Sequence, residues 1–108
     1  MPRQMLQFVA VTSGGTAYEI EFPLHPETRS AQAVADLVTQ LLETISRCAR
    51  DRDDVSDGDI LQALAMTSAI RGRMLEGDPQ LIARLMRQLY DDAREAVNAA
   101  ESYTAARA

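Results

Sequence analysis

Apolar and polar side chains alternate over about residues 4–24, on either side of the dipeptide Gly14-Gly15. Such alternation predicts two β-strands, and Gly-Gly supplies the positive φ angles that a two-residue hairpin turn requires. With this dipeptide as the turn, Val9 would face Ile20 and one side of the ribbon would be nearly all apolar. An isolated two-stranded ribbon is marginal in water, so the hairpin must be covered by helices or by a partner.

Three later segments carry apolar side chains at intervals of three and four residues, which is the spacing of one helix face. Ser56, with Asp59 three residues on, is typical of a helix N-cap. Gly77 predicts a helix end, and Asp78-Pro79 predicts the start of another helix. The predicted helices span about residues 28–50, 57–76 and 79–104.

These elements predict a helix-dominated α+β fold of order ββααα. We expect one domain over residues 1–108, in which the N-terminal two-stranded antiparallel hairpin packs on a three-helix bundle. A chain of this length buries only about two-thirds of the surface that its unfolded form exposes, so a partner could add stability. We therefore expect a homodimer, formed through the helices or through an open edge of the hairpin.

The second predicted helix is apolar over more than half of its circumference, and this makes it a candidate for recognition. Methionine is flexible and repacks against varied surfaces, so a Met-rich stripe can serve as an interface if it is exposed. Core packing is the competing interpretation of the same stripe. The predicted protein-interface residues are Met66, Ile70, Met74, Met86, Tyr90 and Val97.

Residues that could carry chemistry are few and scattered. His25 is the single histidine, lies in a connector and has no nearby partner for catalysis or metal binding. Cys48 falls on the apolar stripe of the first predicted helix, where we expect a small core side chain. The acidic connector 51–59 has the composition of a calcium loop but not its spacing. The sequence therefore predicts no enzyme, no catalytic residue, no metal and no cofactor.

Sixteen acids against eleven bases give a net charge of −5, which repels nucleic acid and anionic membranes. All the bases are arginine, a bias typical of GC-rich bacterial or phage genomes. The lone cysteine and the absence of a long apolar run predict a cytoplasmic protein with no membrane association.

Three functional hypotheses follow. The first is a small acidic non-enzymatic regulator, of the anti-activator or adaptor type, that docks apolar helix surface on a partner protein. It would mask or bridge an interface, for example the dimer contact of a transcription factor. The second is a phage-type inhibitor that mimics nucleic acid charge. It would need its carboxylates on one face: Asp36, Glu43, Asp53, Asp54, Asp57, Asp91, Asp92 and Glu95.

The third hypothesis is a DNA-binding helix-turn-helix around Gly77-Asp78-Pro79. Four arginines lie near this turn, but Glu76 and Asp78 lie within it, so nucleic acid binding is disfavoured. The four arginines are Arg71, Arg73, Arg84 and Arg87.

Overall fold

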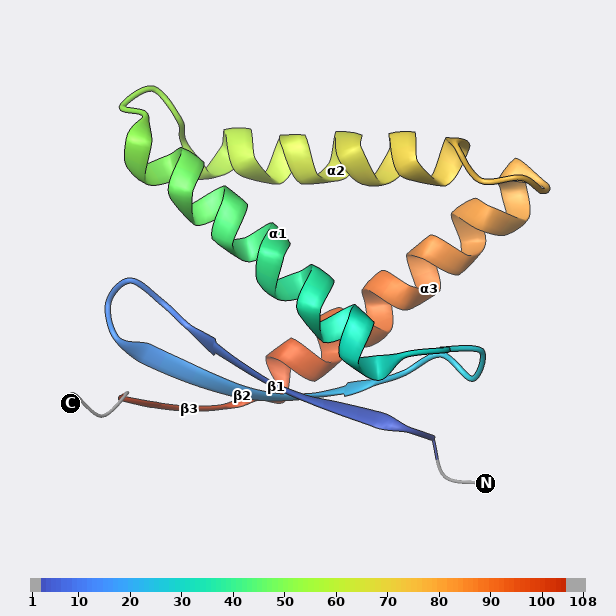
Figure 1. The fold of residues 1–108 in the computed structure, drawn as a ribbon, viewed down its shortest axis with the longest axis horizontal. Coiled ribbons are helices and arrows are strands. Elements are labelled where there is room, and N and C mark those ends of the chain that lie inside the picture. Colours follow the sequence, from blue (N-terminus) through green and yellow to red (C-terminus); the bar gives the residue numbers. More distant parts are fainter. Residues whose placement is uncertain (1–2, 105–108) are drawn as a thin grey trace. The chain divides into compact units, whose positions relative to one another are not determined.

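The computed structural model describes residues 3–104 and contains three strands and three helices (Figure 1). In chain order these are β1 (Met5–Val11), β2 (Thr16–Pro23), α1 (Ala31–Asp51), α2 (Asp57–Arg73), α3 (Pro79–Asn98) and β3 (Glu101–Thr104). The predicted helix-dominated α+β class, a hairpin followed by three helices, is confirmed. The third strand was not predicted.

The chain divides into two units. The sheet unit comprises Met1–Ala35 and Arg87–Ala108, and the helical unit comprises Asp36–Met86. The sheet unit is therefore built from both ends of this sequence, and the helical unit lies between them along the chain. The expectation of a single domain stays a prediction.

The hairpin exists as predicted, but its register differs by one residue. Val9 pairs with Glu19 rather than with Ile20, because the loop between the strands has three residues instead of two. The Thr12 N–H donates to the Thr16 carbonyl oxygen at 2.8 Å. Only Gly15 has a positive φ, of 87°, and Gly14 does not. A three-residue loop of this kind places its left-handed residue last, which displaces the pairing by one.

This register decides which side chains share a face of the sheet. Phe8 pairs with Ile20, and Leu6 pairs with Phe22, so these four apolar residues lie on the same face. The rings of Phe8 and Phe22 contact edge to face, with centroids 6.4 Å apart. Ile20 is buried on this face, whereas the opposite face carries Gln7, Glu19 and Glu21 together with the buried Ala17. The buried apolar residues of the described chain are Ala17, Ile20 and Leu24, all in or next to β2.

The third helix was predicted to run to about residue 104, and this was wrong. It ends at Asn98, and Glu101–Thr104 form β3, which pairs antiparallel with β2 (Figure 1). The apolar stripe of the helix thins to alanines at this end, so a helical continuation would bury little. Pairing with β2 instead satisfies the backbone groups of both strands. The strand order is β1-β2-β3.

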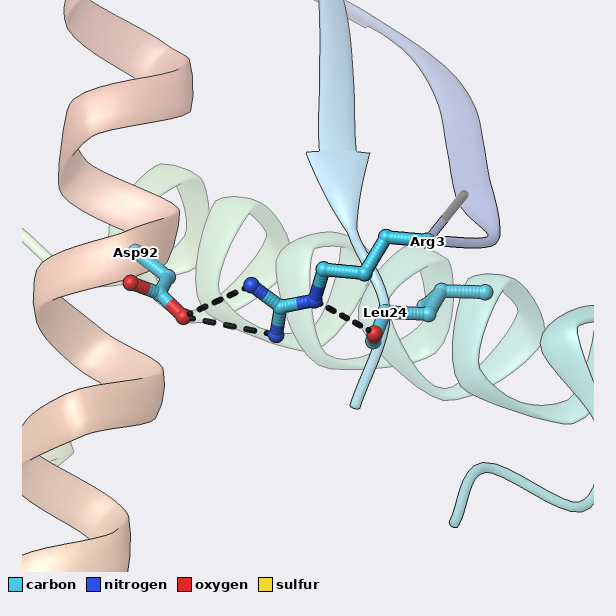
Figure 2. A network of polar contacts seen from close by, with 3 residues as sticks. All are labelled: Arg3, Leu24 and Asp92. Carbon is cyan, nitrogen blue, oxygen red and sulfur yellow. Dashed lines mark hydrogen bonds and ion pairs between the residues drawn. The ribbon is translucent and has the colours of Figure 1, made fainter. Parts of the chain in front are cut away.

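A polar network ties the start of the described chain to α3 within the sheet unit (Figure 2). Nε of Arg3 donates to the Leu24 carbonyl oxygen at 3.2 Å. Both terminal nitrogens of the same guanidinium lie 3.5 Å from Oδ2 of Asp92. These groups are partly exposed, so their net contribution to stability is at most about 1 kcal/mol. The network joins the part of α3 that belongs to the sheet unit to Leu24, which follows β2.

Local signals set most helix ends. Asp78 caps α3 as predicted, with its Oδ1 accepting from the Gln80 N–H at 2.9 Å. Ser30 caps α1 through the Ala33 N–H at 3.0 Å, so this helix begins at residue 31 rather than 28. The second helix ends at Arg73 rather than at 76, before the turn at Gly77, whose φ is 133°. None of the helices in the described chain is long and apolar enough to cross a membrane.

Candidate protein interface

The start of α2 is fixed by a reciprocal pair of hydrogen bonds. Oγ of Ser56 accepts from the Asp59 N–H, and Oδ2 of Asp59 accepts from the Ser56 N–H, both at 3.1 Å. This is the capping box that the sequence predicts, with Asp in the place where Glu is more usual. It satisfies two N–H groups that would otherwise lack intrahelical partners.

The large apolar side chains of α2 are exposed. Met66, Ile70 and Met74 keep 57%, 62% and 70% of their accessible surface, and Leu61 keeps 68%. Within the helical unit the single buried residue is Gly72. Exposed apolar side chains recur around the circumference of this helix, which makes it a candidate for an interaction site. We call the surface formed by Met66 and Ile70 the Met66 face.

The other predicted interface residues lie on α3 and divide between the units. Met86 belongs to the helical unit and is half-buried against Gly72. Tyr90 and Val97 belong to the sheet unit and are exposed. All six predicted residues except Met86 are thus accessible, which is the condition that the interface interpretation requires. Binding by any of them stays a prediction.

An open groove, here groove A, lies between the second half of α1 and the first half of α2. From α1 it is lined by Leu41, Ile45 and Cys48, among others. Its volume is about 390 Å³, and Val55 of the connector lines it. From α2 it is lined by Asp59, Ile60, Ala63, Leu64 and Thr67.

A second groove, groove B, lies between the second half of α2 and the start of α3. Gly72 permits this approach, because a Cβ at this position would lie 2.7 Å from Sδ of Met86. From α3 it is lined by Pro79, Ile82, Ala83 and Met86, and from α2 by Ala65, Ser68, Ala69, Gly72 and Arg73.

Cys48 is exposed in groove A, so its predicted place in the core was wrong. The stripe of three- and four-residue spacing to which it belongs was identified correctly, and Ile45 on the same stripe is half-buried. The signal for an apolar face was therefore present in the sequence. A helical periodicity shows which side is apolar but not what covers it.

The acidic connector, which here includes the end of α1, the loop after it and the first turn of α2, lies at one end of groove A. Residues 50–59 hold five aspartates and two arginines. Arg52 donates to both carboxylate oxygens of Asp54, at 2.9 and 2.8 Å. These bonds hold the pKa of Asp54 below its ordinary value and raise the pKa of Arg52. The connector remains negative overall, because the aspartates outnumber the arginines by three.

His25 lies in the connector between β2 and α1, as the sequence predicts. Its Nδ1 accepts a hydrogen bond from the Glu27 N–H at 3.1 Å, which closes the turn after Leu24. Over residues 3–104 no three histidine, cysteine or acidic side chains gather closely enough to hold a metal ion.

Comparisons of this chain with protein-family models, with curated protein sequences and with solved structures found no match.

Proposed function

We propose that this chain is a non-enzymatic protein-binding regulator, of the adaptor or anti-activator type, that binds an amphipathic helix of a partner protein in groove A. By binding that helix, the chain would mask an interface of the partner or bridge the partner to another protein. The observation that carries the proposal is an apolar groove open to solvent with an acidic connector at one end.

The floor of groove A is suited to a helix. Two helices of this chain form its walls, and an amphipathic helix laid between them would bury apolar side chains against both. Leu41 and Leu64 contribute from opposite walls and are 56% and 41% exposed. An apolar groove that is lined on two sides recognises residues spaced by three and four along a partner helix.

The charge beside groove A indicates which residues the partner helix should carry. The negative connector at one end of groove A favours a partner with arginine or lysine next to its apolar stripe. Asp53 and Asp57 are exposed in this connector. We therefore propose a partner segment that is apolar on one side and basic at one end, with affinity that falls as salt increases.

The test compares two leucines on one helix. Leu41→Asp places a charge in groove A, whereas Leu37→Asp makes the same change one turn earlier, outside the groove, at a side chain of similar exposure (59%). Affinity purification from lysate of the source organism should recover a stoichiometric protein with the native and Leu37→Asp chains and lose it with Leu41→Asp. Recovery of the same protein by all three chains would contradict the proposal, as would recovery of none by the native chain.

Cys48 provides a second measurement at the groove itself. It is the single cysteine of the chain and is exposed, so a maleimide should modify it readily in the free protein. A partner helix in groove A should slow this modification at least tenfold. Undiminished modification in the complex would place the partner elsewhere.

A further inference from the structure

The Met66 face lies between the two grooves. With 3.6 residues per turn, the α2 positions that line groove A are centred about a quarter turn from Met66, and those that line groove B are centred about a quarter turn from it in the other direction. Neither groove includes Met66 or Ile70. Two sides of α2 are therefore approached by α1 and α3, and this apolar face has no cover within the helical unit.

When the α2 sequence is read in reverse about Met66, the positions that line groove A coincide with those that line groove B. Asp59, seven residues before Met66, lines groove A, and Arg73, seven residues after it, lines groove B. The other four α2 positions of groove A lie at the same distances from Met66 as the other four of groove B, in the opposite direction along the helix. The corresponding pairs are Ile60 and Gly72, Ala63 and Ala69, Leu64 and Ser68, and Thr67 and Ala65. A second helix that runs antiparallel across Met66 would thus meet equivalent surroundings at both ends.

The charges of α2 are arranged for such a pairing. Its first turn carries Asp57 and Asp59, and its last turn carries Arg71 and Arg73. Asp59, Met66 and Arg73 share one face, since positions seven residues apart lie within about 20° of each other. An antiparallel copy would set Asp59 beside Arg73 twice. A parallel copy would place like charges together, which is unfavourable.

We propose that the Met66 face is covered by a second copy of this chain, with the two α2 helices antiparallel and the two-fold axis passing at Met66. In this arrangement Met66 meets its own counterpart, and Ile70 lies near Gln62 of the other copy. The interface is isologous, as expected of a two-fold dimer. Of the residues that line groove A it uses Asp59 alone and leaves the apolar lining open, so the dimer would present two binding sites to the partner proposed above.

Mass and cross-linking test this arrangement together. Light scattering at tens of micromolar should give twice the chain mass of 11.9 kDa. In a Cys48→Ser background, Met66→Cys should form a disulfide-linked dimer on mild oxidation. Met74→Cys is the matched control: Met74 is more exposed, but its counterpart on an antiparallel helix lies about 24 Å away along the axis, so it should stay unlinked.

A charge variant tests the contact between helix ends without a new cysteine. Arg73→Glu would face Asp59 of the other copy at both ends and should raise the dimer dissociation constant roughly tenfold at low salt. Arg47→Glu makes the same change in charge on α1 and should leave this constant within about twofold of the native value.

Three results would overturn the proposal: a monomer mass for the native chain, cross-linking of Met74→Cys at the rate of Met66→Cys, or equal weakening by the two arginine variants. Failure of the partner-binding proposal would leave these outcomes unchanged, because Leu41 does not lie on the Met66 face. Failure of the dimer proposal would likewise leave the partner proposal testable, because a partner helix bound to a monomer would still slow the modification of Cys48.

Discussion

The capping box of α2 gives the sharpest test of how this helix is held. Ser56→Ala removes the oxygen that accepts the Asp59 N–H at 3.1 Å, and Asp59→Ala removes the reciprocal acceptor. Both residues are exposed, so water can solvate the released N–H groups in part. Each change should therefore lower the free energy of unfolding by about 1 kcal/mol. The double variant should lose about 0.5 kcal/mol less than the sum, because each half of the box orients the other.

The measurement is urea unfolding followed by circular dichroism, at a protein concentration below the dimer dissociation constant, so that the proposed contact of Asp59 with a second copy does not contribute. Ser68→Ala is the matched control, since it makes the same change in the middle of α2. Alanine is favoured over serine at such a position by about 0.5 kcal/mol, so this variant should be neutral or slightly more stable. If Ser56→Ala were as stable as Ser68→Ala, the capping box would contribute nothing and the account of the α2 start would be wrong.

Three further changes have defined outcomes. Gly72→Ala should stabilise the chain, as judged by its melting temperature, less than an unobstructed helical substitution does, because its Cβ would lie 2.7 Å from Sδ of Met86, and moving that flexible side chain aside offsets part of the gain of about 1 kcal/mol from helix propensity. Gly15→Ala should cost about 1–2 kcal/mol in urea unfolding, because residue 15 has a φ of 87°. Arg52→Gln should raise the pKa of Asp54 in an NMR titration, because the Arg52 hydrogen bonds lower it. Since that pKa is lowered in the folded chain, the stabilisation is present at neutral pH and is lost as the pH falls through it.

Controls for the glycine variants come from the same chain. Gly58→Ala is also in α2, and its Cβ would meet no atom closer than 3.7 Å, so it should stabilise the helix by up to about 1 kcal/mol. Gly14→Ala lies next to Gly15 but has no positive φ and should be tolerated. Equal effects of Gly72→Ala and Gly58→Ala would refute the close approach of Met86. For Arg52→Gln, an unchanged pKa of Asp54 would refute the ion pair.

The features that the sequence predicted well depend on short-range chemistry. Ser56 with Asp59 and Asp78 with Pro79 each begin a helix, because the capping groups lie within three residues of each other. The hairpin follows from strand alternation around a glycine pair. The α+β class is the sum of such local choices, which explains why it could be predicted from one sequence.

The features that were missed depend on pairing over distance or on fine turn geometry. The extra loop residue, Ser13, displaces every cross-strand pair by one, and a Gly-Gly dipeptide suits both loop lengths. β3 forms because β2 offers an open edge more than eighty residues earlier in the chain, a contact that helical periodicity does not reveal. The exposure of Cys48 depends likewise on which surfaces α1 and α2 leave uncovered.

The pairing of β3 with β2 has a consequence for how the chain acquires its structure. Thr16 and Thr104 meet although 88 positions separate them, so the third strand can add only after a very long segment has been traversed. Non-local pairings of this kind slow folding, because the chain loses the entropy of loop closure before the strand contacts form and stabilise it. β1 and β2, by contrast, are joined by a three-residue loop and can associate within microseconds. Folding kinetics should therefore show hairpin formation first and the pairing of Glu101–Thr104 with β2 last. The helical unit can form its own contacts between these two events.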